Sequence, residues 1–160
     1  MTRVAIYAGT FDPVTLGHMD IIERAVEIFE EVILAVAVET PKDTLFTLKE
    51  RVTMARQVVS HLPSVQVESF KGLLVAYAQA RGVHVLLRGL RAYSDFEYEF
   101  QMALTNRKLA PEIETLFMMP NEIHSYVSSS TVREVARLGG DTSEFVPPVV
   151  NKAIRKKLSR

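Results

Sequence analysis

The densest group of chemically useful residues lies near the start of the chain, in residues 9–13 and 15–18, which read Gly-Thr-Phe-Asp-Pro and Thr-Leu-Gly-His. The leading glycine lets the backbone turn sharply, and Thr10 offers a hydroxyl and an amide to a phosphate. Gly17 permits close backbone approach, and His18 stands where a helix would begin. Because a helix N-terminus attracts anions, this segment predicts phosphate binding. A plain turn with a helix-capping histidine is the alternative.

A second group of residues could hold a polyphosphate. Arg88 and Arg91 flank Gly89 and Leu90 directly after an apolar run. Two guanidinium groups at this spacing suit bidentate recognition of phosphate oxygens. Lys42 follows an earlier apolar run and could add a third cation. A solvated pair of arginines and an ordinary surface lysine are the alternatives.

Hydroxyl and carboxylate side chains form a third group. Residues 128–131 read Ser-Ser-Ser-Thr and place a row of hydroxyls and amides at the start of an expected helix. One serine would act as an N-cap, and the others could bind phosphate. Asp95 and Glu99 lie four residues apart on one helix face. They could hold the arginines in place, accept hydrogen bonds from a ligand hydroxyl, or form a solvated face.

The sequence predicts no resident metal site. The other histidines are too scattered to join His18 around a metal ion: His61, His84 and His124. No pair of carboxylates has metal-binding spacing, so Mg²⁺ would arrive with a nucleotide. Neither a Gly-x-Gly-x-x-Gly motif nor a phosphate-loop lysine motif occurs.

The elements that must position these residues follow from an alternation of apolar runs and amphipathic segments. Expected strands are 4–8, 32–38, 65–70, 83–87 and 114–119. Six helices are expected. Two are opened by capping boxes, at 47–50 and at 94–97, and the second of them runs to about 108. The others are 21–31, 73–81 with Gly82 as the C-cap, 131–138 before Gly139, and one from Pro148 to about 158. This pattern predicts a five-stranded parallel α/β sheet with helices on both faces and ligands beyond the carboxyl ends of the strands.

Composition limits the class of protein further. The 160 residues fit one domain, which we expect to span 1–160. The absence of cysteine excludes disulfides, thiolate zinc sites and a cysteine nucleophile. Because 19 basic residues balance 19 acidic ones, nothing attracts the chain as a whole to nucleic acid or an anionic membrane. With no apolar run of membrane-spanning length and no signal peptide, we expect a cytoplasmic protein.

Three of these motifs, taken in order, resemble those of a known superfamily. Residues 9–18 resemble the Thr/His-x-Gly-His motif of the nucleotidyltransferases, and residues 127–130 with Arg133 fit their second motif. Residues 88–91 and 95–99 are most similar to one family, the bacterial phosphopantetheine adenylyltransferases. The similarity covers essentially the whole chain, with departures at Ala8, Leu16 and His124.

The resemblance implies a single-domain, Rossmann-like nucleotidyltransferase fold. It also implies an activity, the reversible transfer of the adenylyl group of ATP to 4′-phosphopantetheine, which gives dephospho-coenzyme A and pyrophosphate in coenzyme A synthesis. Such enzymes use Mg²⁺ with ATP, form homohexamers and can be inhibited by coenzyme A.

By position, the resemblance also implies site residues. Contacts to phosphopantetheine would come from Thr10, Lys42, Leu74 and Arg88. Contacts to ATP would come from Thr10, Phe11, His18, Gly89, Leu90, Arg91, Glu99, His124, Ser125, Tyr126, Val127, Ser128, Ser129 and Ser130.

The residues agree with this chemistry. An attacking phosphate monoester is largely ionised at neutral pH, since its second pKa is about 6. It needs no general base, and we expect direct attack without a covalent intermediate. Cations and oriented amides would lower the barrier between two anions. We therefore expect His18, Lys42 and Arg91 to stabilise the negative charge of the transition state. Thr10 would align the nucleophile, and residues 128–130 would bind the β- and γ-phosphates.

Two alternatives remain at this level. Another nucleotidyltransferase, acting on glycerol phosphate with CTP or on nicotinamide mononucleotide with ATP, would share the first motif, although residues 88–91 and 95–99 favour phosphopantetheine. A non-catalytic module that senses ATP or coenzyme A would bind nucleotide without releasing pyrophosphate. The presence of His18, Lys42 and Arg91 together argues against such a module.

Overall fold

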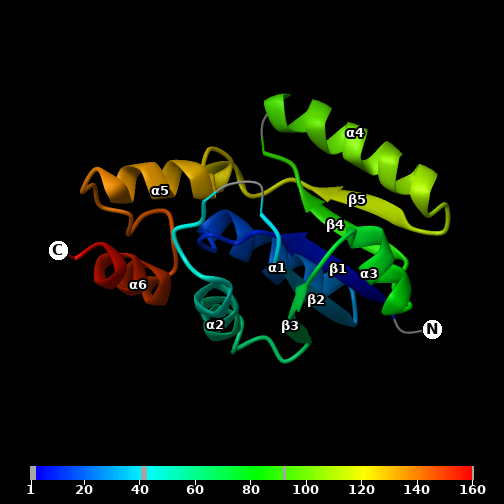
Figure 1. The fold of residues 1–160 in the computed structure, drawn as a ribbon, viewed down its shortest axis with the longest axis horizontal. Helices are drawn as coiled ribbons and strands as arrows, with labels where there is room; N and C mark the ends of the chain where they lie inside the picture. The colour runs from blue at the N-terminus through cyan, green and yellow to red at the C-terminus, as the bar shows by residue number, and fades with distance from the viewer. Residues whose placement is uncertain (1–2, 41–42, 92, 160) are drawn as a thin grey trace.

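The computed structural model describes residues 3–40, 43–91 and 93–159 and contains one five-stranded parallel sheet. Its strands are β1 (Val4–Gly9), β2 (Glu31–Ala37), β3 (Val65–Phe70), β4 (Val85–Gly89) and β5 (Glu114–Met118). They lie in the order β3-β2-β1-β4-β5, and each neighbouring pair is parallel. The predicted parallel α/β fold is therefore confirmed (Figure 1).

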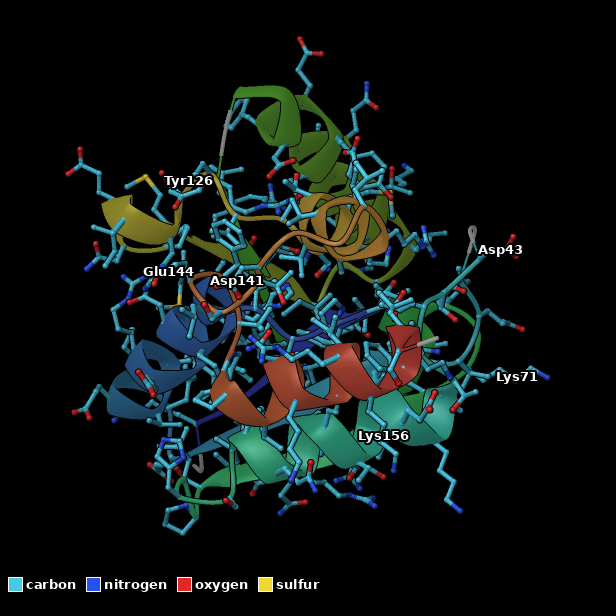
Figure 2. The ribbon with its side chains drawn as sticks, turned by 90° about the vertical axis from the view of Figure 1, so that its left-hand side faces the viewer. Asp43, Lys71, Tyr126, Asp141, Glu144 and Lys156 are labelled. Atoms are coloured by element: carbon cyan, nitrogen blue, oxygen red, sulfur yellow. The ribbon has the colours of Figure 1, made fainter. Side chains whose placement is uncertain are left out.

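Helices cover both faces of this sheet. They are α1 (Leu16–Ile28), α2 (Leu48–Val58), α3 (Leu74–Ala80), α4 (Tyr93–Leu109), α5 (Ser129–Arg137) and α6 (Pro148–Leu158), with a short 3₁₀ helix η1 at Glu122–His124. In Figure 2, α6 lies along α2. Helix α4 stands beside β5 at one end of the sheet (Figure 1). No helix in the described ranges is long and apolar enough to cross a membrane.

The two sides of the sheet have separate apolar cores, because successive strand residues point to opposite faces. Ala5 and Tyr7 of β1 pack in the core that contains buried side chains of α1, α2, α5 and α6. Ile6 and Ala8 pack on the other face, against buried residues of α3. Burial on both faces explains the continuous apolar runs of β1 and β2.

Three helix starts differ from the prediction by two residues or more. Helix α5 begins at Ser129 rather than at 131, because Ser128 is its N-cap. Helix α1 begins at Leu16 rather than at 21, because Thr15 is its N-cap and His18 completes the capping box in place of the usual glutamate or glutamine. The capping box predicted at 94–97 is wrong, since α4 already includes Tyr93 and Ser94 therefore lies inside the helix. Gly82, at φ +65°, has the predicted left-handed conformation after α3.

The capping box predicted at 47–50 is confirmed. Thr47 accepts a hydrogen bond from the Glu50 amide at 3.2 Å, and the Glu50 carboxylate accepts one from the Thr47 amide at 2.8 Å. Glu50 also pairs with Lys157 at 2.9 Å, which ties α6 to α2. The start of α2 is therefore fixed by its own sequence and by the C-terminal helix.

Thr47→Ala is expected to lower the free energy of unfolding by about 1 kcal/mol, because it removes the N-cap acceptor. Urea unfolding measures the change. Thr53→Ala is the control, since Thr53 is exposed in the middle of the same helix and alanine is the better helix former there. An equal loss in both variants would show that the cap contributes nothing.

Candidate active site

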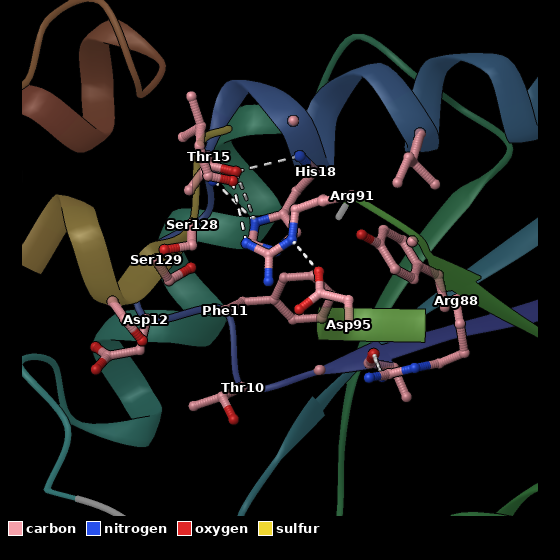
Figure 3. Close-up of a pocket in the computed structure, with 18 of the residues that line it drawn as sticks. Thr10, Phe11, Asp12, Thr15, His18, Arg88, Arg91, Asp95, Ser128 and Ser129 are labelled. Carbon is pink, nitrogen blue, oxygen red and sulfur yellow. Dashed lines mark hydrogen bonds and ion pairs between the residues drawn. The ribbon is translucent and has the colours of Figure 1, made fainter. Parts of the chain in front are cut away.

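A cleft of about 340 Å³ opens at the carboxyl ends of β1 and β4, where the strand order reverses. Most of the predicted site residues line it: Thr10, Phe11, His18, Arg88, Gly89, Arg91, Glu99, Val127, Ser128, Ser129 and Ser130. Figure 3 shows how the loop after β1, the start of α1 and the segments after β4 and before α5 bring these side chains together. Parts of the chain that are far apart in the sequence therefore build one site.

Other predicted residues lie elsewhere. Leu74 lines a second hollow that adjoins the cleft, and Lys42 lies outside the described residues. Leu90, His124, Ser125 and Tyr126 do not line the cleft. The Leu90 amide continues the sheet by donating to the Met118 carbonyl, and Tyr126 is 69% exposed at the periphery (Figure 2). His124 lines a separate hollow beside α1.

The capping role of His18 determines which of its ring nitrogens is free. The Thr15 amide donates to Nδ1 of His18 at 2.9 Å, so Nδ1 is an acceptor and the proton of the neutral ring is on Nε2. Nε2 has no protein partner among the described residues. Burial lowers the pKa of His18 to about 3, and the charges of Arg91 and Arg88 act in the same direction. His18 is therefore a neutral Nε2–H donor at the cleft. The capping interpretation is confirmed, and the functional role of His18 stays a prediction.

Aromatic side chains hold this histidine in place. The Phe11 ring meets the His18 ring edge-on, with centroids 5.0 Å apart, and Tyr7 packs edge-on against Phe11 at 5.4 Å. Phe11 is buried and has φ +50°, a left-handed backbone conformation that costs energy in a residue with a side chain. A Cβ at Gly9 would lie 3.2 Å from the Phe11 ring, a tight contact that glycine avoids.

Arg88 is held at the floor of the cleft by two side-chain hydrogen bonds. It donates to both carboxylate oxygens of Glu99, at 2.8 and 2.6 Å, and to the Ala8 carbonyl at 2.7 Å. Glu99 is only 7% exposed. Burial by itself lowers the pKa of Arg88, but the hydrogen bonds and charge of Glu99 outweigh this effect, and the pKa is raised. Glu99 therefore holds an arginine, one of the roles that the sequence left open.

Arg91 is also held by a carboxylate and a backbone carbonyl. Its Nε donates to Asp95 at 2.9 Å, and another nitrogen donates to the Val127 carbonyl at 3.1 Å. Both side chains of this pair are about a third exposed. Figure 3 shows Arg91 beside His18, with Asp95 below it. Two paired but accessible guanidinium groups and a neutral donor thus face the same space.

The three serines at the start of α5 already have protein partners. Ser128 caps the helix by accepting from the Thr131 amide, Ser129 donates to the Pro13 carbonyl, and Ser130 accepts from Arg133. The amides of Ser129 and Ser130, in the first turn of α5, make no hydrogen bond within the described chain. Amides rather than hydroxyls are therefore the donors this helix presents to the cleft.

Two supporting residues, Asp12 and Arg51, were missed in the sequence. Asp12 is 1% exposed and accepts from the amides of Leu45 and Phe46, at 2.8 and 2.9 Å, which anchors the segment before α2. Arg51 of α2 donates to two backbone carbonyls. The available signal was spacing, because Arg51 lies at i, i+4 and i+7 with Ala55 and Val58 on the buried face of its helix.

The second hollow lies on the far side of the Arg88–Glu99 pair, which lines both spaces. It is bounded mainly by α3, α4 and the segment before α3: Gly72, Leu73, Leu74, Tyr98, Met102, Ala103 and Asn106. A ligand with an anionic group at Arg88 could extend an uncharged arm into it.

Three carboxylates of the cleft bind protein donors, whereas Asp43, which also lines the cleft, is exposed. Asp12 binds backbone amides, Asp95 binds Arg91 and Glu99 binds Arg88. Among the residues that the structure describes, no cluster of three metal-ligating side chains occurs. A divalent cation could be held here through ligand phosphates, as Mg²⁺ commonly is in nucleotide sites.

Comparison with known proteins gives the class of this site. The cytidylyltransferase-like family model matches residues 6–135. The fold also superposes on a Plasmodium falciparum nicotinic acid mononucleotide adenylyltransferase, with TM-score 0.71 and 14% identity, over 98% of this chain and 96% of that one. A Vibrio parahaemolyticus structure gives TM-score 0.72 and 17% identity, over 96% and 99% of the two chains. Fold and family match together define a nucleotidyltransferase.

Curated relatives give the family within that class. Phosphopantetheine adenylyltransferases from Desulforudis audaxviator, Heliobacterium modesticaldum and Alkaliphilus metalliredigens are 51%, 54% and 53% identical. The matches cover 97%, 96% and 97% of this chain and 95%, 92% and 99% of the relatives. The chain belongs to the phosphopantetheine adenylyltransferase family, as the motifs predicted, and is an enzyme.

Proposed function

We propose that this enzyme transfers the adenylyl group of ATP to 4′-phosphopantetheine, reversibly, and forms dephospho-coenzyme A and pyrophosphate in coenzyme A synthesis. The observation that carries this proposal is a cleft in which Arg88, Arg91 and a neutral His18 donor face one space, with a second hollow beyond Arg88. The family membership supports the identity of both substrates.

The proposed reaction is a direct in-line displacement. A phosphate oxygen of phosphopantetheine forms a bond to the α-phosphorus of ATP, and the bond from that phosphorus to the bridging α–β oxygen breaks as pyrophosphate leaves. The nucleophile is already ionised, so it gives up no proton to the enzyme. A His18 with pKa about 3 suits this chemistry, because it is a poor base and a constant donor near neutral pH.

Each side chain has a proposed task in this scheme. The Nε2–H of His18, with Arg91 and Lys42, stabilises charge on the reacting phosphates, and the Thr10 hydroxyl aligns the nucleophile. That hydroxyl makes no protein hydrogen bond in the described part of the chain. The first amides of α5 bind the β- and γ-phosphates.

The other substrate would lie across Arg88. We assign the phosphate of phosphopantetheine to Arg88, Thr10 and Lys42, and its uncharged arm to the hollow that Leu74 lines. Mg²⁺ would enter with ATP and supply charge neutralisation on the phosphates. Four predicted ATP contacts lie outside the cleft: Leu90, His124, Ser125 and Tyr126. They would require the nucleotide to reach beyond the cleft, and they stay predictions.

Assembly, regulation and compartment are proposed from the resemblance to the family. We propose a homohexamer in the cytoplasm that coenzyme A inhibits, since coenzyme A carries both the pantetheine arm and the adenylyl group of the product. Self-association is supported by large exposed apolar side chains on α4 and around β5: Phe96, Tyr98, Phe100, Met102, Leu104, Leu109, Leu116, Phe117 and Met119. An exposed apolar surface of this kind is typical of a protein interface.

Pyrophosphate release tests the proposed reaction. We expect turnover with ATP, 4′-phosphopantetheine and Mg²⁺, and none with CTP and glycerol phosphate or with ATP and nicotinamide mononucleotide. Turnover in one of the other mixtures would keep the reaction class and reject the substrate. ATP binding without pyrophosphate release in any mixture would favour a sensing module.

A further inference from the structure

The end of β1 and the loop that follows it form a segment, residues 8–12, that is anchored by three arginines from three different elements. Alternate carbonyls of this segment, those of Ala8, Thr10 and Asp12, accept hydrogen bonds of 2.7, 2.8 and 2.6 Å. The donors are, in the same order, Arg88 of β4, Arg51 of α2 and Arg133 of α5. Arg88 and Arg133 line the cleft, whereas Arg51 does not. Arg51 therefore acts on the site only through the backbone.

Burial of the Arg51 side chain costs free energy. Arg51 is 2% exposed, its Nε has no hydrogen-bond partner, and no carboxylate of the described chain lies within ion-pair distance of it. Burial lowers its pKa, and the charge of Asp12 opposes this effect only in part. Since a buried charge without an ion-pair partner is costly, an apolar side chain would pack here at lower cost. Packing alone therefore does not explain why a charged side chain occupies this position.

The hydrogen bonds of Arg51 set the direction of one peptide group. One guanidinium nitrogen donates to the Thr10 carbonyl at 2.8 Å and to the Ala37 carbonyl, at the end of β2, at 2.9 Å. In a planar trans peptide the N–H points away from the C=O, so the Phe11 N–H points away from Arg51. That N–H has no acceptor within the described residues. Phe11 itself lines the cleft and is held at φ +50°.

We propose that Arg51 is a positioning residue that turns the Thr10–Phe11 peptide so that the Phe11 N–H donates to a phosphate oxygen in the cleft. The guanidinium also polarises this peptide through its carbonyl oxygen, which makes the N–H a stronger donor. The nature of the anion rests on the proposed function, which places the ATP and phosphopantetheine phosphates here. Without Arg51, the peptide would be free to rotate and present a carbonyl oxygen to those phosphates.

Kinetics of two matched variants test the effect on catalysis. Arg51→Met is expected to lower kcat by about 10- to 100-fold, near the scale for losing one oxyanion-type donor, with KM for ATP changed less than about threefold. Arg56→Met removes an exposed arginine from the same helix and should leave both parameters unchanged. Arg51→Lys keeps the charge but not the planar donor group, and its kcat should be intermediate.

A binding measurement that does not depend on turnover tests the geometry. The chain contains eight phenylalanines, and selective ¹⁵N labelling gives one amide signal for each; the Phe11 signal is the one missing from Phe11→Leu. On addition of pyrophosphate to the wild-type enzyme, the Phe11 amide proton should shift downfield more than the others. The shift should disappear in Arg51→Met and persist in Arg56→Met.

The two readouts keep this inference separate from the proposed function. An Arg51-dependent Phe11 shift in an enzyme that does not consume ATP and phosphopantetheine would reject the function and keep the inference. A Phe11 shift of wild-type size in Arg51→Met would overturn the inference. It would also be overturned if kcat fell only in proportion to the fraction of unfolded protein, which circular dichroism measures. If Arg51→Met does not fold, a wild-type shift and kcat in Arg51→Lys would overturn it.

Discussion

Replacement of His18 by alanine is expected to lower kcat by about 100-fold or more, the scale for losing one donor to a developing negative charge. The Thr15 amide occupies Nδ1 and leaves Nε2–H as the donor at the cleft. Alanine removes that donor and also the side-chain half of the capping box. Steady-state pyrophosphate release measures kcat, and the temperature of unfolding shows how much of the loss is structural.

The pH dependence and a control variant make this prediction specific. Because the pKa of His18 is lowered to about 3, the ring stays neutral from about pH 5 to 9, and kcat/KM should show no ionisation of His18 in that range. Thr15→Ala should weaken the same cap while keeping the Nε2–H, and its kcat should fall far less than that of His18→Ala. Near-normal turnover of His18→Ala would remove the residue from the mechanism.

The lowered pKa of His18 also makes the stability of the fold depend on pH. The unfolded chain, with an ordinary histidine pKa of about 6.5, takes up a proton before the folded chain does. His18 therefore favours unfolding as the pH falls from about 6.5 towards 3, and has no such effect at higher pH. In His18→Gln this contribution to acid sensitivity should be absent.

Glu99→Ala is expected to lower the free energy of unfolding by about 2 kcal/mol and to abolish most turnover, because it leaves the partly buried Arg88 without its partner. Asp95→Ala breaks a more exposed pair on the same helix, so it should cost no more than about 1 kcal/mol. Chemical unfolding of the two variants measures this difference.

A double variant separates stability from function. Arg88→Met with Glu99→Leu replaces the pair by apolar side chains, so most of the lost stability should return while turnover stays low. If the double variant regained turnover, Arg88 would have no part in substrate binding. If Glu99→Ala kept wild-type stability, the pair would not be the structural element described here.

The sheet and the location of the cleft could be predicted because they follow from local patterns. Runs such as residues 32–38 are apolar throughout, which is typical of strands covered on both faces, and polar residues after each strand marked the binding edge. The start of α2 was predicted to the residue, since Thr47 and Glu50 form a standard capping box. Helix α1 was predicted late because His18 performs the task usually given to a glutamate.

The remaining features depend on contacts between distant parts of the chain. Residues 128–130 were predicted to offer both hydroxyls and amides, but the Ser129 hydroxyl donates to the carbonyl of Pro13, more than a hundred residues away. The role of Arg51 depends on the Thr10 and Ala37 carbonyls, which the helix period alone cannot identify. Glu99 had several possible roles until β4 and α4 were placed together.

The strand order also determines when the site can form during synthesis of the chain on the ribosome. β1, β2 and β3 emerge first and can pair with one another, so Thr10, His18 and Arg51 can be in place early. One side of β1 must then wait for β4, and the anchor on Asp12 waits for Arg133. A nascent chain stalled between these stages would expose an apolar, unpaired edge of β1, which is a ready point for aggregation or for binding by a chaperone.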